Sequence, residues 1–153
     1  IVPAVVWQVW PEKEEPLDPP PVVAQKLESS ASTEQQVKAA NDFIRHGPAA
    51  RSEVRAAITQ HERYEPEVVA PLVQATMKNR DYRSVPTLIE LLDHPDPLVR
   101  GRAGAAITKI IGADMGYRAN MPEAERKKMI EAIKFTYQQA LPQLQQHYSG
   151  QTQ

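Results

Sequence analysis

The chain has 153 residues, no cysteine and a formal net charge of −1, with a pI near 6.5. Its length suits a single domain with a buried core, and the lack of thiols excludes cysteine chemistry. The nearly balanced charge gives no overall attraction to nucleic acid or to an anionic membrane, and no apolar run approaches the ~20 residues that span a bilayer.

Residues 1–30 are predicted to form an extended, proline-rich N-terminal arm. They contain six of the fourteen prolines, both tryptophans and five acidic against two basic residues, which separates them from the rest of the chain. The segment Ile1–Trp10 is almost wholly apolar, yet Pro3 and Pro11 disfavour a regular helix or central strand there. The run Asp18–Pro21 favours a stiff, extended backbone.

The apolar part of this arm needs a cover, because an exposed segment with two tryptophans would promote aggregation. Docking into another protein chain is favoured, since Trp is enriched in the energetic centres of interfaces. Two alternatives stay open: the arm folds back on its own helices, or it is a remnant without fixed structure. The predicted partner-binding residues are Val5, Val6, Trp7, Val9 and Trp10.

Residues 31–153 are predicted to form a helical repeat domain of about six helices. Ser32 can cap the first helix, with a glutamine three residues later completing a capping box, and Gly47 ends that helix. Pro48 and Pro66 are each placed to open a further helix. The helix that starts at Pro66 fits against either of its neighbours, so its pairing stays open.

The stretch 84–112 is predicted to be one complete helical hairpin. Its first helix has an apolar stripe at helical spacing, formed by Val85, Leu88, Ile89, Leu91 and Leu92. Asp96 is placed to cap the second helix, and Gly112 to end it. Gly101 and Gly104 would let another helix approach closely. The residues of the second helix expected in the core are Leu98, Val99, Ala103, Ala106, Ile107, Ile110 and Ile111.

A last helix is predicted from about Pro122 to His147, with a kink at Pro142. Its apolar stripe is formed by Met129, Ile130, Ile133, Tyr137 and Leu141. Together with the preceding helices it makes between two and three hairpins, close to the minimum for a stable repeat array.

The hairpin at 84–112 resembles a HEAT repeat, particularly the bacterial HEAT-like kind. The likeness lies in the Leu/Ile run, the turn at 93–97, the pair Val99-Arg100 and the small residues of the second helix. A weak echo stands 45 residues earlier, at Val54-Arg55. The resemblance implies an all-α fold, a short α-solenoid, in which Asp and Arg residues tie successive repeats together. The structural repeat residues that it implies are Asp93, Pro97, Val99 and Arg100.

The sequence predicts no catalytic residue, no metal ligand and no cofactor-binding residue. The four histidines, His46, His61, His94 and His147, lack metal-ligand spacing and fall where helix ends and turns are expected. No phosphate-binding loop, nucleophile elbow or dinucleotide fingerprint occurs. Lys78, Arg80 and Arg83 form a basic cluster at a predicted turn, but acidic residues are interleaved along the chain, so nucleic-acid binding is not favoured.

We therefore expect a non-catalytic protein–protein interaction module, an accessory or scaffold subunit that bridges copies of a larger enzyme or assembly, giving a hetero-oligomer or filament. The resemblance also leaves two alternatives: a DNA-binding or DNA-repair HEAT-like protein, and a bilin-lyase-like HEAT protein, which visible absorbance of the purified material would expose. The sequence begins at Ile1 rather than at Met, and we expect that a preceding segment was removed, by cleavage of an export signal or by an artificial boundary.

Overall fold

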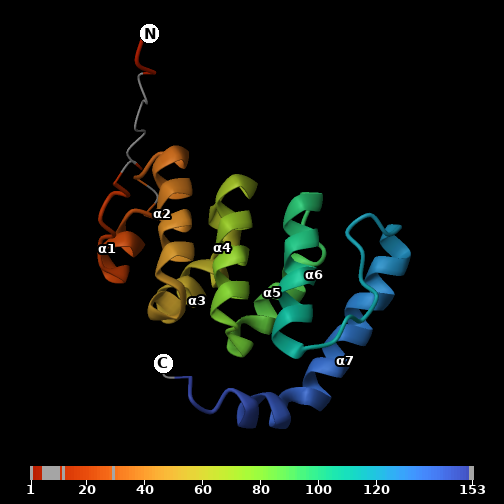
Figure 1. Ribbon diagram of the computed structural model, residues 1–153. Helices are drawn as coiled ribbons and strands as arrows, with labels where there is room; N and C mark the ends of the chain where they lie inside the picture. Colours follow the sequence, from red (N-terminus) through yellow and green to blue (C-terminus); the bar gives the residue numbers. More distant parts are fainter. Residues whose placement is uncertain (1, 5–10, 12, 29, 152–153) are drawn as a thin grey trace.

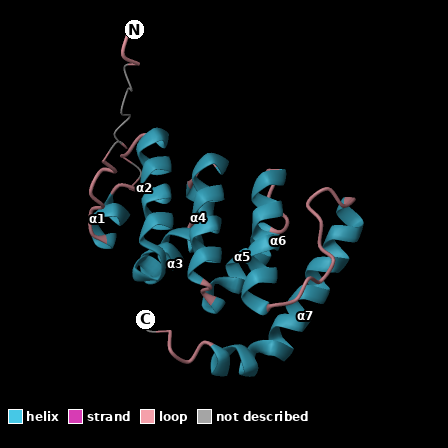
Figure 2. Cartoon of the chain, in the orientation of Figure 1, coloured by secondary structure: helices cyan, strands magenta, loops and turns pink. Residues whose placement is uncertain are grey.

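The computed structural model describes residues 2–4, 11, 13–28 and 30–151, and over these ranges the regular structure is helical without strands (Figure 2). Three single 3-10 turns stand at Gly47–Ala50, His61–Arg63 and Tyr82–Ser84. The prediction of an all-α chain with about six helices is confirmed, and a short helix precedes them. The α-helices are α1 (Pro20–Gln25), α2 (Thr33–His46), α3 (Arg51–Thr59), α4 (Pro66–Asn79), α5 (Val85–Leu91), α6 (Pro97–Ile111) and α7 (Glu123–His147).

Helices α2, α4 and α6 lie side by side and run in the same direction, with α3 and α5 behind them (Figure 1). The pairing that the sequence left open has a simple answer, because α4 packs against both α2 and α6. Helix α7 passes across the α6 end and changes direction along its length, which brings the C-terminal residues back toward α4 (Figure 1). There the Gln151 side chain donates a hydrogen bond to the Arg80 carbonyl at 2.6 Å.

Two apolar clusters form the core, and α4 contributes to both. Val68 and Leu72 pack with α2, α3 and α1, whereas Val69 and Val73 pack with α5, α6 and α7. Nine of the fourteen residues of α4 are buried, so this helix is apolar on two sides rather than on one stripe.

Most of the predicted helix ends are confirmed, including those at Gly47 and Pro66. The Ser32 hydroxyl accepts a hydrogen bond from the backbone N–H of Gln35, and the Gln35 side chain accepts one from Ser32, which completes the capping box. The Asp96 carboxylate accepts from two backbone N–H groups at the start of α6, and Gly112 ends α6 with a left-handed backbone. The helix expected from Pro48 instead begins with a 3-10 turn and becomes α-helical at Arg51.

The expectation of an extended arm through residue 30 is wrong for its last part. Pro20–Gln25 forms α1, because Pro20 and Pro21 supply the backbone angle and the missing N–H that a first helical turn tolerates. Val23 and Leu27 are buried against α2 and α3. The predicted partner-binding residues Val5, Val6, Trp7, Val9 and Trp10 lie outside the described residues.

The small residues of α6 meet a loop rather than the helix that we expected. Tyr117, in the segment between α6 and α7, lies over Gly104, and its hydroxyl donates to the Leu92 carbonyl at 2.5 Å. A Cβ added at Gly104 would stand 2.7 Å from the Tyr117 ring, whereas one at Gly101 would stand 3.6 Å from the nearest side-chain atom.

Gly104→Ala should therefore destabilise the fold by about 1–3 kcal/mol, because the Tyr117 ring is held by its hydrogen bond and cannot simply move aside. The control is Gly101→Ala, which adds the same methyl in ordinary contact and should stabilise the helix by roughly 0.5–1 kcal/mol. Urea denaturation monitored by circular dichroism measures both changes. Equal free energies of unfolding for the two variants would contradict the Tyr117 packing.

A buried ion pair links α3 to the turn after α4. The Arg55 guanidinium donates to both carboxylate oxygens of Asp81, at 2.7 and 2.9 Å, and the Asp81 side chain is only 2% exposed. Asp81 also accepts from the Ser84 hydroxyl at 2.9 Å. This carboxylate is thus fully satisfied and holds the α4–α5 connection against α3.

Asp81→Asn should lower the free energy of unfolding by about 2 kcal/mol, because it leaves the partly buried Arg55 guanidinium without a counter-ion. The matched control is Asp114→Asn, which breaks the exposed pair with Arg118 and should produce no measurable change. Thermal unfolding of both variants tests the difference. A loss in Asp114→Asn as large as that in Asp81→Asn would contradict the role of burial.

Candidate functional site

The outward side of α2, α4 and α6 forms one continuous surface, which we call the three-helix face. On α4 it carries positions 67, 71, 74 and 78, and on α6 positions 98, 102, 105 and 109. The two sets share the same spacing of four, three and four residues, which keeps side chains in line on one side of a helix. The parallel helices therefore present aligned rows of side chains across the face.

The upper end of the three-helix face, near the helix N-termini, is a hollow of about 330 Å³ with a mixed lining. Val37, Pro71 and Leu98 are among its apolar residues, and amide, acidic and basic side chains make up about half of the lining. Leu98 was predicted to lie in the core, but it is 57% exposed, because the first turn of α6 directs it outward while Val99 is buried. Pro71 has no N–H, so the Glu67 carbonyl lacks its usual intrahelical donor at this hollow.

The lower end of the face, near the helix C-termini, is basic. Lys78 lies in the last turn of α4, Arg80 follows directly, and Lys109 lies in the last turn of α6. Arg80 and Lys109 are exposed, and both border the same three hollows, of about 310, 420 and 680 Å³. The predicted basic cluster at this turn is thus joined by a cation from a helix about thirty residues away in sequence.

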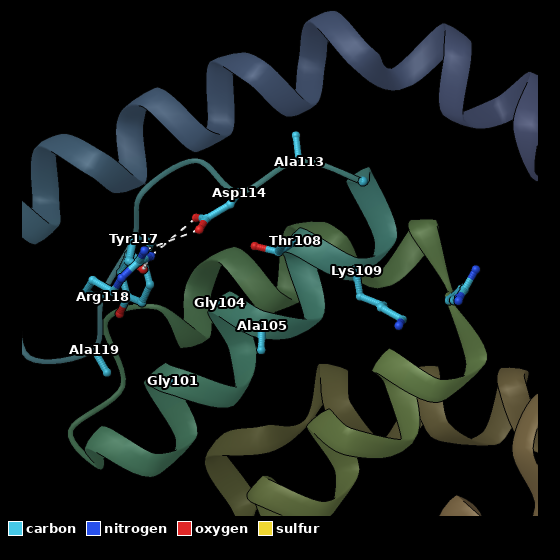
Figure 3. A pocket seen from close by; sticks show the side chains of 12 residues that line it. Gly101, Gly104, Ala105, Thr108, Lys109, Ala113, Asp114, Tyr117, Arg118 and Ala119 are labelled. Atoms are coloured by element: carbon cyan, nitrogen blue, oxygen red, sulfur yellow. Dashed lines mark hydrogen bonds and ion pairs between the residues drawn. The ribbon is translucent and has the colours of Figure 1, made fainter.

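The largest of these hollows lies between α6 and the loop that follows it (Figure 3). Its floor is the small-residue surface of α6 at Gly101 and Ala105, and its far edge carries the ion pair of Asp114 with Arg118 (Figure 3). A hydrogen bond from the Gly116 backbone N–H, with the Arg118 guanidinium adding to it, lowers the pKa of Asp114 below its ordinary value. Asp114 is therefore ionised at neutral pH, and this edge carries no net charge.

The predicted structural repeat residues lie at the start of α6 and the turn before it. Pro97 is the first residue of α6, and Val99 is buried. Arg100 donates to the Ala119 carbonyl at 2.9 and 3.1 Å and to the His94 carbonyl at 2.9 Å. Asp93 does not meet Arg100 and pairs instead with Arg126 of α7 at 3.1 Å. Both residues thus connect the hairpin to the segment that follows it.

The histidines lie at separate places, at helix ends and turns. His46 ends α2 with its Nε2 2.7 Å from the Asp18 carbonyl, and His61 lies beside Glu90. His94 accepts a hydrogen bond from the Asp96 N–H through Nδ1, and burial lowers its pKa below the ordinary value. His147 packs edge-on against Tyr148. Within the described ranges no group of three or more His, Asp or Glu side chains is arranged to hold a metal.

Sequence reasoning missed three features of the site. Lys109 joins Arg80 only because α4 and α6 are parallel neighbours, and Leu98 faces outward only because of the phase of the first turn of α6. The Arg55–Asp81 pair joins residues 26 positions apart. A usable signal did exist for that pair, since Arg55 occupies the position that corresponds to Arg100 in the internal repeat.

Comparison of the chain with protein-family models, with curated proteins and with solved structures gives no match. In the part of the chain that the structure describes, none of the helices has the length and apolar character needed to cross a bilayer.

Proposed function

We propose that this chain is a non-catalytic interaction module, a short HEAT-like α-solenoid that acts as an accessory or scaffold subunit of a larger assembly. The carrying observation is the three-helix face, a hollowed surface over three parallel helices that has an exposed leucine at one end and a basic group at the other. The N-terminal arm would supply a second contact surface, so that one molecule could join two neighbours.

The solenoid interpretation is supported by two contacts that each tie a helix to a later connection along the chain. Arg55 of α3 reaches forward to Asp81, in the turn before α5, and Arg100 of α6 reaches forward to Ala119, in the loop before α7. Both arginines follow a buried valine, and each binds the next connection along the chain. Repeat arrays are stabilised by contacts of this nearest-neighbour kind.

The docking role of the face is supported by the exposed leucine at its upper end. Leu98 is 57% exposed beside a proline-lined hollow, so its burial under a partner would stabilise the complex. The helices beneath are fixed by the two cores, so the surface is ordered before a partner arrives. A preformed surface loses little conformational entropy on binding.

Leu98→Glu should weaken capture of the native partner by about tenfold or more, because it places a charge in the apolar contact. The control is Phe135→Glu on α7, which makes the same kind of apolar-to-acidic change at a side chain that is 64% exposed and lies outside the three-helix face. Both variants would be used as bait in the native host, and the recovered stoichiometric complex quantified. Equal recovery with wild type and Leu98→Glu would show that the face is not the docking site.

Deleting residues 1–11 should abolish assembly with the partner complex while leaving the helical content unchanged, because the described helices begin only at Pro20. Size-exclusion chromatography with light scattering measures assembly, and circular dichroism measures helicity. Assembly that survives the deletion intact would contradict the bridging role of the arm.

A DNA-binding function is the second candidate, favoured by the grouping of Lys78, Arg80 and Lys109 on one surface. Titration with plain duplex DNA at several salt concentrations separates it from the leading proposal. Affinity that falls steeply with salt, with no protein complex recovered from the host, would favour this candidate.

A further inference from the structure

We infer that the lower end of the three-helix face binds a carboxylate-bearing segment of a protein partner, with Arg80 and Lys109 as the cations that recognise it. This inference rests on the proposed function, since it specifies the chemistry of the partner that docks on that face.

The first observation is that neither charge has an acidic partner among the described residues. No carboxylate of the described residues lies within ion-pair distance of either Arg80 or Lys109, whereas Arg45, Arg55 and Lys127 all have one. Lys78, beside them, donates to the Ile44 carbonyl at 2.7 Å. Two exposed cations at the meeting point of three hollows give a local positive potential that attracts an anion.

The second observation is the backbone of Arg80. The three parallel helices all end in a residue of positive φ: Gly47 at +62°, Gly112 at +83° and Arg80 at +48°. Glycine adopts this conformation without steric cost, while a residue with a Cβ does not. Fold stability alone therefore favours glycine at position 80, and the arginine keeps a charge at the face against that preference.

Lys109 taken alone would not point to a partner. It lies in the last turn of α6, where the helix dipole favours a cation for structural reasons. Its significance comes from its place beside Arg80, since both residues border each of the three hollows. A carboxylate that enters from any of these hollows can approach both cations.

A protein segment fits the surface better than a nucleic acid. Duplex DNA is bound through many phosphate contacts, and the cations at this end of the face are few. The neighbouring Asp114–Arg118 pair adds no net positive charge to them. The exposed Leu98 on the same face suits a partner that carries apolar as well as acidic side chains.

The test uses fluorescence anisotropy with a labelled peptide of Glu, Leu and Ala about as long as α4, and with the same peptide carrying Gln for Glu. The full chain should bind the acidic peptide more tightly than the Gln peptide at low salt. The double variant Arg80→Gly/Lys109→Gln should bind the acidic peptide about tenfold more weakly. The control double variant Lys127→Gln/Lys134→Gln changes the net charge equally at α7 and should bind like wild type.

Unfolding cannot explain the expected loss, because the single variant Arg80→Gly should melt at a higher temperature than wild type while binding the peptide more weakly. Equal binding of the acidic and Gln peptides, or an equal loss in both double variants, would overturn the inference. Tighter binding of duplex DNA, lost in the same Arg80/Lys109 variant, would assign the surface to nucleic acid instead. If Leu98→Glu loses the native partner while Arg80→Gly/Lys109→Gln captures it like wild type, the carboxylate inference is overturned and the proposed docking function is retained.

Discussion

The structure depends on one constraint, which is that α4 must be covered on two adjoining sides. Val68 and Leu72 on one side and Val69 and Val73 on the other are all fully buried, so neither cluster is complete without this helix. Burial of this apolar surface holds α2 and α6 against α4, each as a parallel neighbour of that helix. Only a narrow line of α4 stays open to solvent, and that line is the middle of the three-helix face.

The connections between helices are fixed by polar contacts at buried or half-buried places. Arg55 binds Asp81, Arg100 binds the Ala119 carbonyl, and the Tyr117 hydroxyl binds the Leu92 carbonyl. Each joins a helix of one hairpin to the chain segment that follows. Because a buried charge or hydroxyl is costly without its partner, these contacts allow one arrangement of the loops and reject others. The hollow beside α6 has its shape for this reason.

The lower end of the face shows how stability and binding can oppose each other at a single position. Two of the three parallel helices end in glycine, the residue that suits a left-handed backbone, and the third ends in Arg80. The arginine places a charge next to Lys109 and at the mouth of three hollows. Strained backbone conformations are frequent at functional sites. The positive φ of Arg80 is such a strain, and it is one of the observations on which the carboxylate-binding proposal rests.

The sequence by itself determined the local structure, because caps, prolines and apolar spacing act within a few residues. Ser32, Asp96 and Gly112 mark their helix ends correctly, and the all-α class follows from the same signals. Sequence reasoning failed where contacts distant in sequence decided the outcome. Val23 and α1 became ordered by packing on α2, Tyr117 rather than a helix covered Gly104, and Leu98 turned outward. The candidate site belongs to this second group, since side-by-side packing of α4 and α6 alone brings Arg80 and Lys109 to one surface.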